Sequence, residues 1–210
     1  MIKYDKITLD FRYRIIKRFF DIIFSLASII ILIPVFILIS LLILLLNGYP
    51  IFYQWNVHGF QGKRFSSYKF RTMTVHADSQ KNDLEKSNEM SGVVFKIKND
   101  PRITNFGKML RKYSLDELPQ LFAVLKGDMS LIGPRPSFPH ELEKFQDWQK
   151  RKLSVVPGLS CIWQVSGRNK IDSFDDWVKL DLYYIDNWSL ALDIEIFFKT
   201  IITVIKGSGT

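Results

Sequence analysis

The sequence feature that most constrains the fold is an uncharged apolar segment near the N-terminus, residues 22–46. A helix rises by about 1.5 Å per residue, so a segment of about 25 residues is long enough to cross a bilayer. The run is too long for the apolar region of a cleaved signal peptide, and no small-residue cleavage site follows it. We therefore expect residues 22–46 to lie in a membrane.

The residues on either side of this segment bear on its orientation. Residues 1–21 are rich in lysine and arginine, and residues 48–74 contain four basic residues and no acidic one. Because basic residues concentrate on the cytoplasmic side of membranes, both ends of the segment favour that side. Pro34 removes one helix hydrogen bond near the middle. The default is one spanning helix, but these facts slightly favour a helix-break-helix that enters and leaves through one leaflet, with Asp21 at the interface near Arg18.

Composition narrows the choice of partners. The chain has 210 residues, 47% hydrophobic and 24% charged, which is enough for one folded domain with a core. Its formal charge of +8 indicates an anionic partner. An anionic phospholipid surface, worth about 1 kcal/mol for each Lys or Arg, accounts for this charge, whereas no nucleic-acid-binding pattern occurs. Cys161 is the only cysteine, which excludes an intrachain disulfide, and the three scattered histidines do not predict a zinc site.

Hydrophobic periodicity and turn residues predict an α+β fold that is mostly helical. Strands are expected at residues 51–53, 64–73, 93–98 and 162–165. Helices are expected from Thr104 to Lys112, from about Asp116 to Lys126, and over residues 139–152, 174–187 and 189–206. The last helix is apolar enough to pack on the core or to lie at a membrane interface. We interpret the polar stretch 76–90 as a connector rather than a surface helix.

The stretch Arg111–Gln120 concentrates polar side chains immediately before an apolar helix. It contains two cations, a hydroxyl and the adjacent carboxylates of Asp116 and Glu117. Pro119 fits only the first turn, so the helix should begin near Asp116, at the positive end of the helix dipole, and Gly127 is a suitable stop. Spacing predicts one buried face for this helix, made of Leu118, Leu121, Phe122 and Leu125.

Two interpretations of this stretch differ in what the carboxylates do. Ser114 and Glu117 fit the S-x-x-E capping box, and Asp is itself a preferred N-cap residue. Alternatively, an ionised Asp116 is suited to act as a nucleophile. These residues alone favour capping. A further candidate is Arg135, which two prolines hold on a stiff loop. A rigid guanidinium suits phosphate binding, although a solvated arginine in a turn is the simpler alternative.

Several motifs occur together and in order along the chain. They are KR at 17–18 with Asp21 and Pro34, YKFRTM at 68–73, DPRIT at 100–104, LRKYSLDELPQ at 110–120, GPRP at 133–136, PG at 157–158 and QVSGRN at 164–169. With these motifs the sequence closely resembles the bacterial monotopic phosphoglycosyl transferases, which are polyprenyl-phosphate hexose-1-phosphate transferases. The resemblance covers essentially the whole chain, as the catalytic module without the extra N-terminal membrane domain of larger relatives. Capping alone then becomes the minor interpretation of Asp116.

The resemblance implies an activity and a location. Residues 1–47 would comprise the basic N-terminus and a re-entrant membrane helix that breaks at Pro34, with Ile33 in place of the family's serine. Residues 48–210 would form a catalytic domain with interfacial amphipathic helices at the cytoplasmic face of the bacterial inner membrane. The reaction would transfer a hexose-1-phosphate from a UDP-sugar to undecaprenyl phosphate, with release of UMP and with Mg²⁺ as cofactor, in exopolysaccharide, capsule or O-antigen synthesis. UDP-galactose or UDP-glucose is favoured; a UDP-N-acetylhexosamine and a homodimer stay open.

The resemblance also implies roles for individual residues. Asp116 would attack the sugar-bearing phosphorus and form a phospho-sugar aspartyl ester. Glu117 would act beside it as metal ligand or base, and Asp116 could also contact the metal. Phosphate or substrate contacts are expected from Arg111, Arg135, Arg168, Lys69 and Arg71. The competing hypothesis is a catalytically silent membrane scaffold in a polysaccharide assembly complex, which would not need Asp116.

Overall fold

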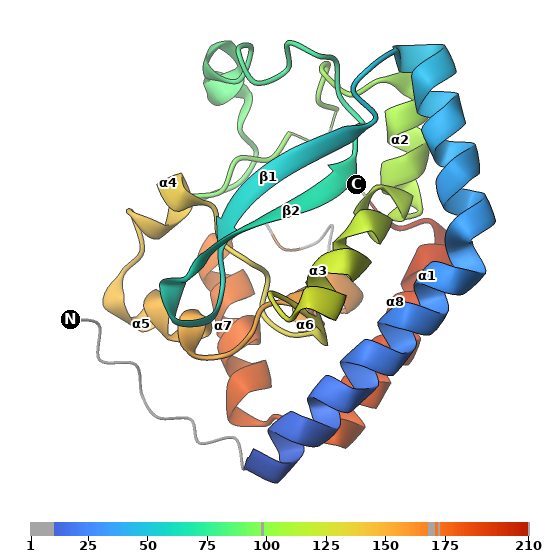
Figure 1. Cartoon of the computed structure of the whole chain (residues 1–210). Coiled ribbons are helices and arrows are strands. Elements are labelled where there is room, and N and C mark those ends of the chain that lie inside the picture. The colour runs from blue at the N-terminus through green and yellow to red at the C-terminus, as the bar shows by residue number, and fades with distance from the viewer. Residues whose placement is uncertain (1–10, 98, 168–170, 172, 210) are drawn as a thin grey trace.

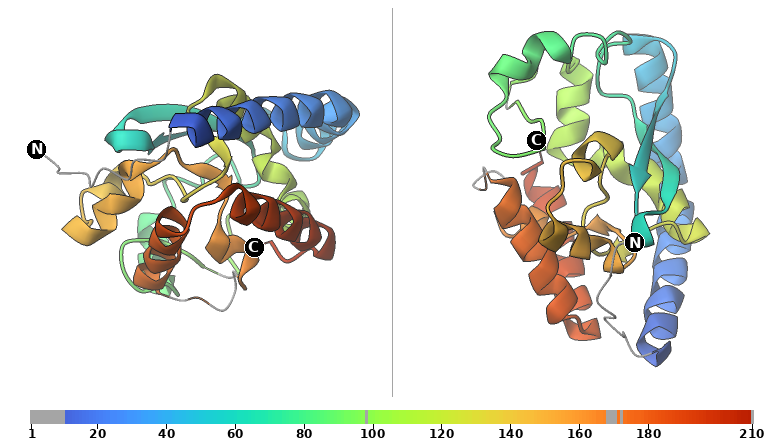
Figure 2. Two further views of the ribbon diagram at one scale, coloured as in Figure 1. Left: turned by 90° about the horizontal axis from the view of Figure 1, so that it is seen from below. Right: turned by 90° about the vertical axis from the view of Figure 1, so that its left-hand side faces the viewer.

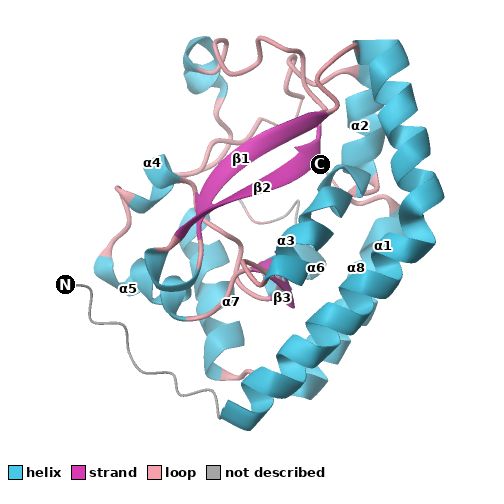
Figure 3. Ribbon diagram, in the orientation of Figure 1, coloured by secondary structure: helices cyan, strands magenta, loops and turns pink. Residues whose placement is uncertain are grey.

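The computed structural model describes residues 11–97, 99–167, 171 and 173–209. Helices predominate over short strands, as predicted for a mostly helical α+β chain (Figure 3). The α-helices are α1 (Phe11–Asn47), α2 (Asn105–Lys112), α3 (Leu121–Lys126), α4 (Pro139–Leu142), α5 (Asp147–Lys150), α6 (Ile162–Val165), α7 (Phe174–Asp186) and α8 (Leu190–Lys206). The strands are β1 (Phe52–His58), β2 (Arg64–Phe70), β3 (Ser130–Ile132) and β4 (Gly158–Ser160). Short 3₁₀ helices are η1 (Phe60–Gly62), η2 (Asn82–Ser87), η3 (Leu115–Gln120) and η4 (Arg151–Ser154).

The predicted membrane segment forms α1, a single helix of 37 residues that continues through Pro34. Figure 1 shows that the axis of α1 changes direction part-way along its length. A proline inside a helix removes one hydrogen bond and clashes with the preceding turn, which is the common cause of such a bend. The helix-break-helix expected from the sequence is therefore a bent but continuous helix.

Both ends of α1 bond to the same globular domain. Near its N-terminus, Lys17 Nζ lies 2.7 Å from Asp193 Oδ2 of α8, and Arg18 donates to the last carbonyls of α3 at 2.5 and 2.6 Å. At its C-terminus, Asn47 Nδ2 donates to Thr104 Oγ1 at 3.3 Å. A helix that spanned a bilayer would carry its two ends to opposite sides. Here one domain bonds to both ends, an arrangement that agrees with the charge pattern of the sequence.

Asp21 is the point where the structure corrects the expectation for this helix. The side chain does not lie at an exposed interface but is only 5% exposed, inside the protein. Its Oδ1 accepts hydrogen bonds from the Ser130 hydroxyl at 3.0 Å and from the Leu131 N–H at 2.9 Å. A buried carboxylate needs such donors, and they come from β3, more than 100 positions along the chain. Sequence neighbours such as Arg18 could not reveal them.

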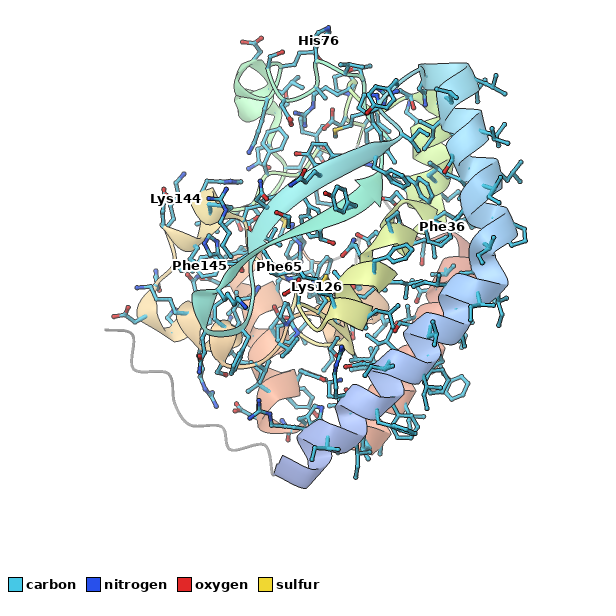
Figure 4. All side chains as sticks on the ribbon, viewed as in Figure 1. Phe36, Phe65, His76, Lys126, Lys144 and Phe145 are labelled. Carbon is cyan, nitrogen blue, oxygen red and sulfur yellow. The ribbon has the colours of Figure 1, made fainter. Side chains whose placement is uncertain are left out.

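The outer side of α1 is an extensive apolar surface. Figure 4 shows its side chains projecting away from the rest of the molecule. Among the described residues, only α1 is both long enough and apolar enough to cross a membrane. Only 11% of its most apolar 18-residue segment is buried inside the protein. The neighbouring helix α8 also exposes large apolar side chains, namely Ile194, Phe198, Ile201, Ile202 and Ile205. Exposed apolar surface of this extent marks a membrane or protein interface.

Strands β1 and β2 form an antiparallel pair that lies over α3 (Figure 1). Phe52 pairs with Phe70 and His58 with Arg64, so the strand predicted at 64–73 forms but ends at Phe70, and the one predicted at 51–53 extends to His58. Trp55, Val57 and Phe65 of this pair pack on Ala123, Val124 and Met129. The sheet and α3 thus hold between them the loop that contains the adjacent carboxylates.

A second, parallel pair forms between β3 and β4, where two glycines come together. Ser130 pairs with Gly158 and Ile132 with Ser160. A Cβ on Gly158 would lie 2.0 Å from the backbone nitrogen of Gly133, and a Cβ on Gly133 would meet the same strand. Only glycine permits this approach. It fixes the start of the loop that carries Arg135.

The C-terminal helices agree with the sequence prediction. Ser189 caps α8 by accepting a hydrogen bond from the Leu192 N–H at 3.1 Å, and Gly207 ends the helix with a φ of 63°. Helix α8 lies beside α1, with the rings of Phe24 and Phe197 5.4 Å apart (Figures 1 and 2). Helix α8 ends at Gly207 close to α2, where a Cβ on residue 207 would lie 2.9 Å from side-chain atoms of both Lys112 and Tyr113.

Three expected elements differ, each for a local reason. Residues 93–97 form no strand, because the Asn88 side chain bonds the main chain of Met90, Val94 and Lys96. Residues 162–165 form helix α6 rather than a strand, since the Gln164 side chain accepts from the Cys161 N–H. The helix expected over residues 139–152 divides into α4, α5 and the start of η4. In the first two cases, side-chain hydrogen bonds to the main chain take the place of the strand pairing that the sequence predicted.

Candidate active site

The adjacent carboxylates lie on η3, a short 3₁₀ helix between α2 and α3. Asp116 is 8% exposed, and the Glu117 side chain is 16% exposed. Ser114, which precedes η3, has a φ of 52° and its side chain makes no capping hydrogen bond. The capping box expected from Ser114 and Glu117 is therefore wrong. The left-handed backbone conformation of Ser114 turns the chain sharply after α2. Both carboxylates therefore lie next to the C-terminal end of that helix.

Glu117 bonds to a lysine on the sheet instead. Lys69 Nζ of β2 donates to Glu117 Oε1 at 2.6 Å. The same ammonium group lies 4.6 Å from the centre of the Trp55 ring on β1. An ion pair with side chains 25% and 16% exposed is less screened than one on the surface. Lys69 thus fixes the position of Glu117 and balances its charge.

Arg111 approaches the carboxylates from the last turn of α2. Its Nε donates to Thr72 Oγ1 at 2.9 Å, just beyond the end of β2. Helix α2 can come this close only because residue 107 is glycine: a Cβ there would lie 2.0 Å from the Thr72 carbonyl oxygen. Thr104 caps the same helix as predicted, accepting from the Gly107 N–H at 3.0 Å. The hydroxyl of Thr72 therefore orients the guanidinium of Arg111.

Arg135 enters the site from the loop after β3. Its guanidinium carbon lies 5.8 Å from the Phe138 ring centre and 5.7 Å from that of Trp177, and its Nη1 is 3.5 Å from Glu141 Oε1. Behind the loop, Lys152 and Asp181 form an ion pair of 3.0 Å with side chains 4% and 1% exposed. Burial raises the pKa of Asp181, while the positive charges of Lys152 and Arg135 oppose that rise. The loop is thus held by rings on one side and by a buried ion pair on the other.

The remaining predicted site residues have different outcomes. Arg71 faces the same cavity, but its terminal nitrogens donate to the carbonyls of Asn47 and Gly48 at 2.7 and 2.5 Å and of Tyr49 at 3.1 Å. Its terminal nitrogens therefore hold the C-terminal end of α1, while the residue also lines the cavity. Arg168 lies outside the described residues.

Two adjoining cavities surround the carboxylates. One, of about 310 Å³, is lined by both Asp116 and Glu117 and by Phe52 and Tyr53 of β1. The other, of about 190 Å³, extends toward Trp163 and Gln164. Both are lined by Trp55, Lys69, Arg111, Glu117 and Arg135. Three cations that converge around two carboxylates form a site suited to a phosphorylated ligand.

A larger cavity of about 460 Å³ lies elsewhere, at the N-terminal end of α1. Its lining includes the cations Arg14, Lys17 and Arg18 but none of the residues predicted from the sequence as catalytic or substrate-binding. Chemistry therefore identifies the candidate active site better than size does. The adjacent carboxylates of Asp116 and Glu117 and the three cations converge at η3.

The donor set bears on a metal ion. Among the residues that the structure describes, no group of three or more His, Cys, Asp or Glu side chains is arranged to hold a metal. Mg²⁺ commonly binds through one or two carboxylates and completes its shell with substrate phosphates and water. Asp116 and Glu117, side by side on the cavity wall, fit that mode but not a closed protein site.

Sequence reasoning did not single out the residues that position these groups. Thr72 lies in the YKFRTM motif without a predicted role, and no role was predicted for Trp55. No motif in the sequence predicts the buried pair of Lys152 and Asp181. A lysine and an aspartate 29 positions apart give no local signal, since only the packing of η4 on α7 brings them together.

Fold and site together define a protein with an apolar helix suited to a membrane and a cation-lined centre around two carboxylates. The family model described as bacterial sugar transferase matches residues 12–207. The chain therefore belongs to the bacterial sugar transferase family.

Curated relatives support this assignment. The chain is 43% identical over 211 residues to the galactosyl transferase CpsE of Streptococcus agalactiae, covering 100% of this chain and 46% of that protein. It is 44% identical over 200 residues to the undecaprenyl-phosphate galactose phosphotransferase of Salmonella typhimurium, covering 93% and 42%. It is 40% identical over 200 residues to the UDP-galactose-lipid carrier transferase of Erwinia amylovora, also covering 93% and 42%. The chain thus spans less than half the length of these relatives.

Proposed function

We propose that this protein transfers a hexose-1-phosphate from a UDP-sugar to undecaprenyl phosphate at a membrane surface and releases UMP. The observation that carries the proposal is the placement of Asp116 in a cavity that Lys69, Arg111 and Arg135 also line. An anionic nucleophile can attack an anionic diphosphate only where positive charge offsets the repulsion. The names of the relatives favour galactose as the sugar.

The reaction proceeds in two displacements. A carboxylate oxygen of Asp116 forms a bond to the sugar-bearing phosphorus, the bond from that phosphorus to the bridging oxygen breaks, and UMP leaves. A phosphate oxygen of the lipid then bonds to the same phosphorus, and the bond to Asp116 breaks. The products are the lipid diphosphate sugar and the regenerated carboxylate. Arg111 and Arg135 hold the diphosphate, while Lys69 keeps Glu117 in place beside the nucleophile.

Mg²⁺ belongs to the proposal as a cofactor. Asp116 or Glu117 would hold it together with oxygens of the donor diphosphate, and when bound it neutralises part of the phosphate charge. The protein side chains orient the donor and exclude water from the buried carboxylate, which is 8% exposed. By the same proposal the site faces the cytoplasmic side of the bacterial inner membrane, where nucleotide sugars are made.

The test is UMP release from a panel of UDP-sugars in the presence of undecaprenyl phosphate. We expect release with UDP-galactose or UDP-glucose, and loss of at least about a thousandfold in Asp116→Asn, as for removal of a nucleophile. Radiolabelled donor without the lipid should leave label on Asp116 in the wild type alone. A UDP-N-acetylhexosamine as best donor would change the sugar assignment. Equal release by wild type and Asp116→Asn, or none with any donor, would favour the silent scaffold.

A further inference from the structure

Another cavity, also of about 190 Å³, lies between α1 and α8 and reaches Glu117 at the same site. Leu32 of α1 and Phe197 and Val204 of α8 line its sides, and Leu131 and Leu159 of the β3–β4 pair line its inner wall. Its surface is almost wholly apolar, whereas each of the two cavities around Arg111 and Arg135 has a large polar share. A narrow apolar cavity of this kind accommodates hydrocarbon rather than a nucleotide.

Glu117 connects this apolar cavity with the polar ones. Its side chain lines the cavity between α1 and α8 as well as both polar cavities, whereas Asp116 lines only the polar cavity of about 310 Å³. The Lys69 ammonium 2.6 Å from Glu117 offsets the negative charge at this junction. A phosphate at the inner end of the apolar cavity would therefore lie next to the nucleophile without meeting an uncompensated carboxylate.

The outer boundary of the cavity is the membrane-facing surface. Leu32 and Val204 line it, while their sequence neighbours Ile31 and Ile205 point outward and are each 73% exposed. The two helices that form the cavity walls are thus the same two that expose the apolar surface. A hydrocarbon chain lying in the bilayer can pass from this surface into the cavity between mainly apolar side chains, and the polar lining residues of the two helices, Ser28, Thr200 and Thr203, carry no charge.

We propose that the lipid acceptor reaches the active site between α1 and α8. Its hydrocarbon chain occupies the apolar cavity and its phosphate meets the nucleophile from the Glu117 side, while the nucleotide sugar occupies the cavities lined by Arg111 and Arg135. This inference rests on the proposed function and assigns its second substrate a separate route. Donor and acceptor then reach Asp116 through different cavities, so UMP can leave through the donor cavities without displacing the lipid.

Paired tryptophan substitutions test the route. Leu32→Trp and Val204→Trp place bulk inside the cavity, and Ile31→Trp and Ile205→Trp place the same bulk on the outer surface one residue away. With undecaprenyl phosphate, we expect the inner variants to raise the KM for the lipid by about tenfold or more, as for steric changes in an apolar pocket. Their single-turnover UMP release without lipid should stay within about twofold of wild type, because the donor cavities are untouched. The outer variants should keep the wild-type KM for the lipid and the wild-type single-turnover UMP release.

Photolabelling separates this inference from the proposed function. An undecaprenyl phosphate analogue with a diazirine in its chain should label residues 28–32 of α1 or 197–204 of α8, and Leu32→Trp should reduce that label. Because labelling needs no turnover, it decides the route even if no donor is active. An unchanged KM in the inner variants, or label confined to the outer faces of the helices, would overturn the proposed route. If the wild type released no UMP from the UDP-sugar in the absence of lipid, the proposed function itself would be overturned instead.

Discussion

The basic residues around the site divide between two tasks that their sequence context does not distinguish. Lys69, Arg111 and Arg135 line the cavities around the carboxylates. Arg71 and Arg18 instead donate to main-chain carbonyls at the ends of α1 and α3, where a cation also balances the negative end of the helix dipole. Lys69 and Arg71 are two residues apart, yet one pairs with Glu117 and the other holds a helix end.

Thr72 tests whether Arg111 must be oriented to hold the donor. Thr72→Val keeps the shape of the side chain but removes the acceptor 2.9 Å from Arg111 Nε. A hydrogen bond to a charged group contributes about 1.5–3 kcal/mol, so we expect the KM for the UDP-sugar to rise about tenfold or more, with a smaller change in kcat. Ser66→Ala on the same strand is the control, since that exposed hydroxyl donates to Asn56 Oδ1 on β1 at 2.6 Å and not to Arg111. Equal KM values in both variants would contradict the positioning role.

The Asp100 carboxylate makes the stability of the fold depend on pH in the acid range. Burial by itself would raise the pKa of Asp100, but hydrogen bonds and charge from Arg102 outweigh burial and lower the pKa below its ordinary value of 3.8. A carboxylate with a lowered folded-state pKa contributes stability above its ordinary pKa and loses it as the pH falls toward the folded-state value. Asp100→Asn should therefore lower the unfolding temperature at pH 7, because a buried pair is broken, typically at a cost of about 3 kcal/mol.

The pH dependence of this variant is the sharper measurement. Thermal unfolding in detergent should show the difference between wild type and Asp100→Asn shrinking as the pH falls below 3.8. Asp147→Asn serves as the control, because that carboxylate is 99% exposed and its partner Lys150 is on the same short helix. A difference that stays constant down to pH 3 would show that the Asp100 carboxylate is not the titrating group.

Glycines set the distances between elements. Helix α2 lies against the end of β2 at Gly107, and the β3–β4 pair closes at Gly133 and Gly158. Neither contact could be read from hydrophobic periodicity, which reports the faces of elements but not how closely their backbones approach. The first contact positions Arg111, and the second begins the loop of Arg135.

Gly107→Ala tests the contact of α2 with the sheet. In an exposed helix this change would stabilise by about 1 kcal/mol, but here the new Cβ would meet the Thr72 carbonyl oxygen at 2.0 Å. The clash should outweigh the gain in helix propensity and lower the free energy of unfolding by about 1–3 kcal/mol. The KM for the donor should rise because Arg111 moves with α2. Lys108→Ala, at an exposed position of the same helix, should leave both unchanged. A Gly107→Ala protein with wild-type stability and KM would show that α2 can shift freely.

Phe122 shows why a face predicted from spacing can be wrong. Of the four residues expected to form the buried face of the helix, Leu121 is 4% exposed but Phe122 is 55% exposed. The α-helix begins only at Leu121, because Leu115–Gln120 form a 3₁₀ helix with a different period. Phe122 consequently points to α1, where its ring lies 6.1 Å from that of Phe36.

The arrangement of the whole molecule predicts the topology of the chain. Because the domain bonds to both ends of α1, cysteines at positions 5 and 63 should lie on the same side of the membrane. We expect Asp5→Cys and Lys63→Cys, each in a Cys161→Ser background, to react with a membrane-impermeant maleimide from one side only, the cytoplasmic side by our proposal. Labelling of the two positions from opposite sides would mean that α1 spans the bilayer and that the domain contacts at one end do not form.

The sequence by itself determined the membrane segment, the mostly helical fold, the capped helices α2 and α8, and the carboxylates and cations around which the site is built. These features depend on residue type and on neighbours within a few positions, so local spacing reveals them. The tertiary structure alone decided that Asp21 is buried, that Arg71 holds the end of α1, and that Thr72 orients Arg111. It also decided that a third, apolar cavity reaches Glu117 from between two helices nearly 170 positions apart. Such contacts arise when distant elements pack together, and a side chain's partners are then set by geometry that sequence neighbours do not encode.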